Sequence, residues 1–144
     1  MWSYPVIFTP DKKTCGYVIT FPDLPFGVTQ GDTVEEAKEM ALDAILTVLD
    51  VLMGEKKTLP KPGKRKGKNV RYVTLNALQA TKAALYTAWL QSGISKTEFA
   101  SRLKIQKTNV DRLFDLWHSS RLEQLEAAFR VLGKSLDIEV RDAA

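Results

Sequence analysis

The fold of the first part of the chain is decided by residues 16–37, which read GYVITFPDLPFGVTQGDTVEEA. Apolar and polar residues alternate over 16–21, as on a strand with one buried face. Pro22 and Pro25 then end the ladder, because proline has no backbone N–H to donate. Thr33 and Glu36 have the spacing of a capping box, which satisfies free amides at a helix start. The stretch therefore predicts a strand, a short second strand at 26–30, and a helix.

The segments on either side complete a small α+β unit. Residues 4–9 alternate in the same way, so we expect a hairpin with 16–21 across the turn at 11–15. Apolar residues recur at helical spacing from Val34 to Leu52, and Gly54 gives the helix a C-terminal stop. The β-branched and aromatic run 70–75 predicts a further strand, either in this sheet or in the next domain.

The net charge changes sign along the chain. The formal total is +4, but residues 1–55 hold 3 basic and 9 acidic residues (−6), residues 56–107 hold 13 and 1 (+12), and residues 108–144 hold 5 and 7 (−2). An acidic front and a basic middle suggest different partners, the basic part meeting nucleic acid.

A lysine-rich segment with four Pro and Gly residues, 56–69, has no apolar periodicity and predicts a flexible basic linker. A second interpretation is that it contacts DNA phosphates and adds a salt-sensitive contribution to affinity. The predicted domains are therefore 1–55, this linker at 56–69, and a second domain at 70–144.

The second domain is predicted to be helical. Four helices fit between Asn76 and Leu132, with capping pairs at Asn76–Gln79, Ser95–Glu98 and Ser120–Glu123. Apolar residues then alternate with charged ones in a terminal strand. A lone strand needs a neighbour, so we expect a homodimer or higher homo-oligomer, with pairing to residues 70–75 as the intramolecular alternative. The predicted dimerising residues are Leu136, Ile138 and Val140.

Residues 97–114, TEFASRLKIQKTNVDRLF, resemble the helix-turn-helix of phage-repressor and Xre-like regulators. Apolar residues on both helices, with Ile105 filling the turn, fix the crossing and leave the opposite face of the second helix for base edges. Lys104 stands where the family usually has glycine, and Gln106 replaces the usual Ser or Thr cap. Simple structural packing of two helices is the alternative. The predicted DNA-binding residues are Gln106, Lys107, Thr108, Asn109 and Arg112.

The motifs FPDLP at 21–25 and TQGDTVEEA at 29–37 resemble the N-terminal domain of HicB-type antitoxins. Phe26 precedes the glycine that often follows FPDLP in the family. The resemblance implies a pared-down ribonuclease H fold, a basic HicA-type messenger-RNA endonuclease as the toxin to be inhibited, and repression of the chain's own operon at a palindromic operator. An acidic surface suits a basic toxin. The predicted toxin-contact residues are Asp23, Glu35, Glu36 and Glu39.

Little in the sequence predicts catalysis. One cysteine, Cys15, and one histidine, His118, leave no disulfide and few ligands, so we expect no catalytic residue, metal or cofactor. A two-metal nuclease needs converging carboxylates, and of the available aspartates only Asp43 lies mid-helix. A stand-alone regulator with a ligand-sensing front domain is the second alternative. No apolar run suits a membrane span or a signal peptide, so a cytoplasmic protein is expected.

Overall fold

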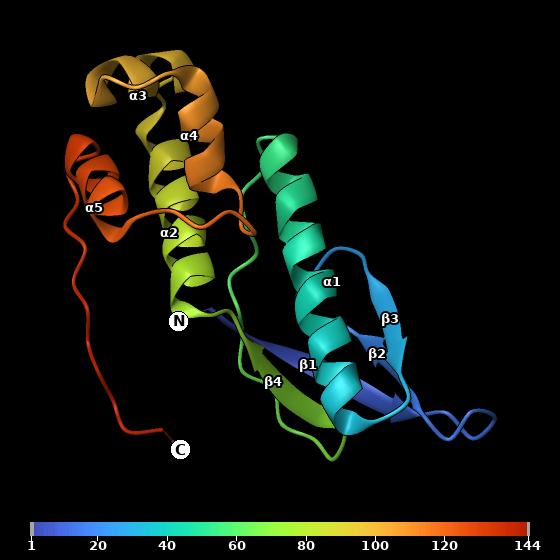
Figure 1. Cartoon of the computed structure of the whole chain (residues 1–144). Coiled ribbons are helices and arrows are strands. Elements are labelled where there is room, and N and C mark those ends of the chain that lie inside the picture. The colour runs from blue at the N-terminus through green and yellow to red at the C-terminus, as the bar shows by residue number, and fades with distance from the viewer. Residues whose placement is uncertain (1, 144) are drawn as a thin grey trace. The chain divides into compact units, whose positions relative to one another are not determined.

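The computed structural model describes residues 2–143, which form two units, one reaching to Ala80 and the other beginning at Thr81 (Figure 1). The first unit contains β1 (Ser3–Pro10), β2 (Tyr17–Thr20), β3 (Val28–Gly31), α1 (Val34–Gly54) and β4 (Val70–Thr74). Helix α2 (Ala77–Ser92) crosses the boundary, and the second unit continues with α3 (Lys96–Leu103), α4 (Lys107–Phe114) and α5 (Leu122–Val131).

The sheet of the first unit has the order β3-β2-β1-β4, and every neighbouring pair is antiparallel. The predicted hairpin is confirmed, with Phe8 opposite Ile19 in the register of β1 and β2. The third strand begins at Val28, two residues later than predicted.

Helix α1 packs on this sheet and begins as the sequence predicts. Thr33 Oγ1 accepts from the Glu36 N–H at 3.1 Å, and Glu36 Oε2 accepts from the Asp32 N–H at 3.2 Å. Gly31 permits the close approach of β3 to the helix, because a Cβ there would lie 2.6 Å from the Ala37 Cα. The shared core includes Tyr4, Val6, Phe8, Ile19, Ala37, Ala41, Ile45, Leu49 and Leu52.

The segment between α1 and β4 differs from the flexible linker predicted over 56–69. It returns the chain from the helix to the sheet and is held to the first unit. Tyr4 Oη donates to the Pro60 carbonyl at 2.6 Å, and the Gly63 N–H donates to Asp23 Oδ2 at 2.7 Å. Leu59 is buried at 4% exposure. Composition gave no signal of these contacts, because each joins residues at least 40 positions apart.

The predicted second domain, 70–144, also starts too early. Strand β4 pairs with β1, Tyr4 standing opposite Val73, so the run at 70–75 belongs to the first sheet. The units divide inside α2, whose start carries the predicted reciprocal cap between Asn76 and Gln79 at 3.0 and 2.8 Å.

The second unit is built around aromatic side chains. The ring of Phe114 lies 5.3 Å from Trp89 and 5.7 Å from Tyr86, edge-on to the latter, and 6.2 Å from Phe99. Trp117 and Leu122 lie outside this core, at 52% and 44% exposure. Helix α5 starts one residue later than its predicted cap, with Gln124 Oε1 accepting from the Arg121 N–H at 3.4 Å.

The last described residues, 134–143, form neither helix nor strand in the single chain. Ile138 is 69% exposed and Val140 is 92% exposed. Pairing with residues 70–75 is not seen, since β4 pairs with β1, and pairing with a second copy stays a prediction. None of the helices in residues 2–143 is long and apolar enough to cross a membrane.

Candidate functional sites

Helices α3 and α4 are joined by the short turn 104–106. Lys104 adopts the left-handed conformation, φ 57° and ψ 41°, where the resembled family usually has glycine. A Cβ in this region costs about 1 kcal/mol. Gln106 caps α4 without a side-chain hydrogen bond, so the start of α4 lacks the side-chain acceptor that Ser or Thr would supply.

Helix α4 has a buried face and an exposed face. Val110, Leu113 and Phe114 are at most 5% exposed and anchor it. Of the five residues predicted to bind DNA, Gln106, Lys107, Thr108 and Arg112 are exposed and Asn109 is half-buried. Arg112 Nη1 donates to Asn109 Oδ1 at 3.3 Å. The structure thus groups these residues on and beside the free face, while their binding of DNA stays a prediction.

An acidic residue also lies on the exposed side of α4, and its charge is paired. Asp111 Oδ1 accepts from Lys96 Nζ at 2.9 Å, which links α4 to the first turn of α3. The Lys96 ammonium also lies 5.8 Å from the ring centre of Phe114. This pairing reduces the repulsion that Asp111 would exert on an anionic partner of α4.

Lys82 is a functional candidate that the sequence interpretation missed. Its side chain is fully buried in α2, and Nζ donates to the carbonyls of Arg112 and Asp115, both at 2.8 Å. These carbonyls lie at the C-terminal end of α4, where unpaired oxygens and the helix dipole favour a cation. Burial lowers the pKa of Lys82 to about 8, against the opposing charge of Asp115. The available signal was a lysine at the helical spacing of Leu78, Leu85 and Trp89, that is, within an apolar stripe.

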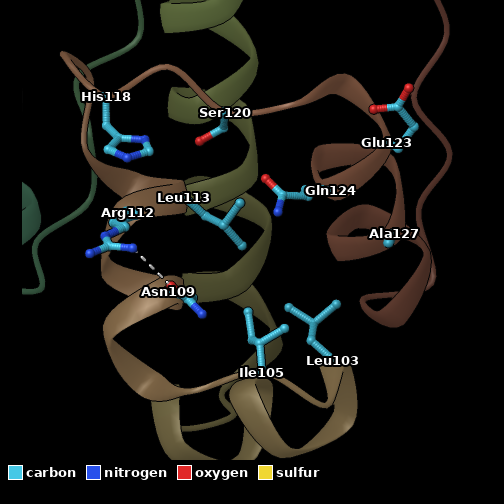
Figure 2. Close-up of a pocket in the computed structure, with 10 residues that line it drawn as sticks. All are labelled: Leu103, Ile105, Asn109, Arg112, Leu113, His118, Ser120, Glu123, Gln124 and Ala127. Atoms are coloured by element: carbon cyan, nitrogen blue, oxygen red, sulfur yellow. Dashed lines mark hydrogen bonds between the residues drawn. The ribbon is translucent and has the colours of Figure 1, made fainter.

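A groove of about 390 Å³ lies between α4 and α5 (Figure 2). Ile105, in the turn between α3 and α4, lines this groove and is 36% exposed. Asn109 and Arg112 line the same groove, which brings two predicted DNA-binding residues next to a concave surface. The remaining lining residues are Leu103, Leu113, His118, Ser120, Glu123, Gln124 and Ala127.

The four acidic residues predicted to contact a toxin have different surroundings. Asp23 is half-buried and accepts from the Gly63 N–H, and Glu36 accepts from the Asp32 N–H, so both have structural roles. Glu35 and Glu39 are exposed on α1, one helical turn apart, and neither forms an ion pair within residues 2–143. Glu35 and Glu39 are therefore the better contact candidates.

Among the aspartates available for a nuclease, Asp11 is held within the hairpin turn. Asp11 accepts from the Lys13 N–H at 3.0 Å and from Thr14 Oγ1 at 3.1 Å in the hairpin turn. Across the described part of the chain, no three His, Cys, Asp or Glu side chains gather as a metal site would require.

A family profile and several relatives match this chain. The profile, described as the HicB_like antitoxin of bacterial toxin–antitoxin systems, matches residues 3–84, which extends past β4. Antitoxin HicB 1 of Photorhabdus laumondii is 36% identical over 137 residues, 95% of this chain and 86% of that protein. Antitoxin HicB of Escherichia coli K12 is 36% identical over 135 residues, 94% of this chain and 96% of that protein.

Antitoxin HicB of Pseudomonas fluorescens is also 36% identical, over 84% of this chain and 83% of that protein. The family profile spans more than half of the chain, and the relatives cover both of its units. The chain therefore belongs to the HicB-like antitoxins of bacterial toxin–antitoxin systems.

Proposed function

We propose that this antitoxin inhibits a cognate HicA-type messenger-RNA endonuclease through its first unit and represses its own operon through its second. The observation that carries the proposal is the extent of the match: the named antitoxins align over 94–95% of the chain, so both units are common to them. Neither role is catalytic.

Toxin inhibition is proposed to use the exposed carboxylates of α1. Glu35 and Glu39 are exposed, one turn apart, and unpaired within residues 2–143, so they offer negative charge to a basic surface. A domain bound there excludes RNA by occupancy and by charge repulsion.

Operator binding is proposed to use α4 in the major groove. Thr108 and Arg112 lie opposite the buried anchors Val110 and Leu113, and Lys107 lies at the helix start, where recognition helices contact bases. Arg suits guanine and Asn suits adenine through paired hydrogen bonds. A homodimer formed through residues 136–140 would place two copies of α4 on the half-sites of a palindrome, in the cytoplasm where such DNA lies.

Co-expression with the neighbouring gene tests both roles. We expect a small basic gene product with a central histidine to co-purify with this chain and to cleave messenger RNA only when the chain is removed. We also expect the chain to retard a fragment of the upstream DNA more strongly than a scrambled fragment. An active toxin in the presence of excess chain contradicts the first role, and equal binding of the two fragments contradicts the second.

A further inference from the structure

A strongly basic surface lies outside α4, on the first unit. We call residues 61–71 the basic segment; all six of its charged side chains are basic and exposed. None of the six forms an ion pair within residues 2–143. The charged residues of the basic segment are Lys61, Lys64, Arg65, Lys66, Lys68 and Arg71.

The backbone of the basic segment is fixed at several points. The Gly63 N–H donates to Asp23 Oδ2 at 2.7 Å. The Arg65 N–H donates to Tyr72 Oη at 2.8 Å, and that hydroxyl donates back to the Arg65 carbonyl at 3.1 Å. Further along, the Val70 N–H donates to the Gly67 carbonyl at 3.3 Å. The segment is therefore an ordered part of the first unit.

Ordering matters because a flexible tether loses backbone entropy for each residue that becomes fixed when it binds. Folding has already fixed the basic segment, so a partner meets cations on a preorganised backbone. Arg71 is held further, with its guanidinium carbon 5.8 Å from the ring centre of Phe8 on the neighbouring strand.

We propose that the basic segment is a second nucleic-acid contact of this antitoxin, which binds the phosphates of duplex DNA without reading their sequence. The proposal rests on the proposed operator binding and adds to it a surface on the first unit. Phosphate contacts by Lys and Arg release counterions, so they supply affinity that falls with salt and is the same for any sequence.

Charge and composition favour duplex DNA over the other partners of a basic surface. A membrane surface would favour apolar side chains for insertion, but Leu59 next to the segment is buried. Tyr72 is 45% exposed, but its hydroxyl is bound to the Arg65 backbone. A basic toxin would be repelled. RNA shares the phosphate chemistry, and the binding experiment separates it from DNA.

The test compares two triple variants of the full chain that each remove three positive charges from the first unit. The first is Lys64→Gln/Arg65→Gln/Lys66→Gln, in the basic segment. The matched control is Lys12→Gln/Lys13→Gln/Lys38→Gln, which removes exposed lysines of the first hairpin turn and of α1. Thermal unfolding verifies that both are folded, as expected for side chains that form no ion pair.

Binding is measured by fluorescence anisotropy on the operator duplex, on a scrambled duplex and on single-stranded RNA of the same length, between about 50 and 200 mM salt. We expect the first triple variant to lose at least about tenfold in affinity for both duplexes, because it lacks three cations that contact phosphates. The plot of log affinity against log salt concentration should also become shallower, by about 0.9 for each lost contact. The control variant is expected to change this slope by less than the amount that corresponds to one phosphate contact.

The inference is wrong if the first variant keeps the affinity and the salt slope of the wild-type chain, or if the control variant loses as much affinity as the first. It is also wrong if the wild-type chain binds RNA more tightly than duplex DNA and the first variant loses that RNA binding. Operator preference is a separate readout. If the wild-type chain binds operator and scrambled duplexes equally, the proposed repression fails, while the comparison of the two triple variants still decides the role of the basic segment.

Discussion

Lys82 and Arg112, thirty residues apart, are joined by a hydrogen bond of 2.8 Å from the buried ammonium of α2 to a carbonyl in the last turn of α4. The same ammonium donates to the Asp115 carbonyl, so one side chain caps the C-terminal end of the helix proposed to read DNA. Helix α4 has eight residues, too few to be stable alone, and depends on such tertiary contacts.

Replacing Lys82 with methionine should destabilise the second unit. The substitution keeps the length and apolar part of the side chain but removes the Lys82 donor from two part-buried carbonyls, which then keep only the backbone N–H groups of Asp115 and His118 at 3.3 and 3.2 Å. The loss of the two shorter bonds costs about 1 to 3 kcal/mol. Urea unfolding measures the loss, and amide hydrogen exchange should rise in α4. Lys134→Met, at an exposed position, is the control. Unchanged exchange in α4 would show that Lys82 does not hold the helix.

The lowered pKa of Lys82 predicts that its contribution to the free energy of unfolding rises with pH. A lysine in a surface ion pair has the opposite effect, because its contribution falls as the pH rises. The pKa of Lys82 is about 8 in the folded chain, against the ordinary lysine value of 10.5 in the unfolded chain, so between these values only the unfolded chain binds the proton. The contribution of Lys82 to stability is therefore present above pH 10.5 and lost as the pH falls through 8. The neutral amine still has two N–H donors for the two carbonyls.

The measurement is the difference in unfolding free energy between wild type and Lys82→Met, followed from about pH 7.5 to 10.5. This difference should grow with pH, by at most about 1.4 kcal/mol per pH unit. Lys134→Met should show no such trend. A difference that shrinks over the same interval would contradict a lowered pKa.

Arg112→Ala is expected to weaken operator binding by about 1 to 3 kcal/mol and to relax base preference, because a guanidinium can pair bidentately with guanine. Lys107→Ala should weaken binding as well. Competition between operator and scrambled DNA measures the preference, with Arg130→Ala on the exposed side of α5 as the control. Neither Arg112→Ala nor Lys107→Ala should affect toxin inhibition. A folded variant that loses both operator binding and toxin inhibition would refute the division of roles between the two units.

Neutralising two carboxylates of α1, in Glu35→Gln/Glu39→Gln, should slow association with the toxin by about tenfold at low salt, because steering depends on charge. Stopped-flow association at two salt concentrations measures the effect. Glu35→Asp/Glu39→Asp retains the charge and should associate nearly as fast as wild type. Glu36→Ala weakens the helix start instead, since it removes the acceptor of the Asp32 N–H. Equal rates for the two double variants would remove these residues from the interface.

Ile138→Glu should convert the predicted homodimer into a monomer, because Ile138 is 69% exposed in the single chain and the predicted strand pairing would cover it. Light scattering should give the mass of one chain in place of two. Asp137→Asn, at the neighbouring and oppositely directed position of the predicted strand, should leave the mass unchanged. A wild-type chain that is already monomeric would exclude this interface.

Local signals correctly placed most elements of this fold. Alternation in β1 and β2, the Thr33 cap of α1 and the reciprocal Asn76–Gln79 cap of α2 each depend on residues within a few positions of one another. The boundary of the second unit was misplaced because strand pairing is long-range: residues 70–74 could join either neighbour, and only the ladder with β1 decides.

The free face of α4 was equally readable, since Val110 and Leu113 mark its buried side at helical spacing. The cap that Lys82 provides at the C-terminal end of α4 could not be predicted in this way. The acceptors of Lys82 are backbone carbonyls about 30 positions away in the chain. Every residue has such a carbonyl, so no residue type in the sequence indicates which ones accept from Lys82.

The sequence by itself determined that the chain has an α+β front, a helical second half and two surfaces of opposite charge, because periodicity, capping and composition are local properties. Tertiary structure decided which of those charges are free. It gave Asp23 and Glu36 structural hydrogen bonds while leaving Glu35 and Glu39 exposed, and it fixed a predicted tether as an ordered basic surface. The physical reason is that a charge acts on a partner only when folding has left it exposed and unpaired, which depends on residues distant in the chain.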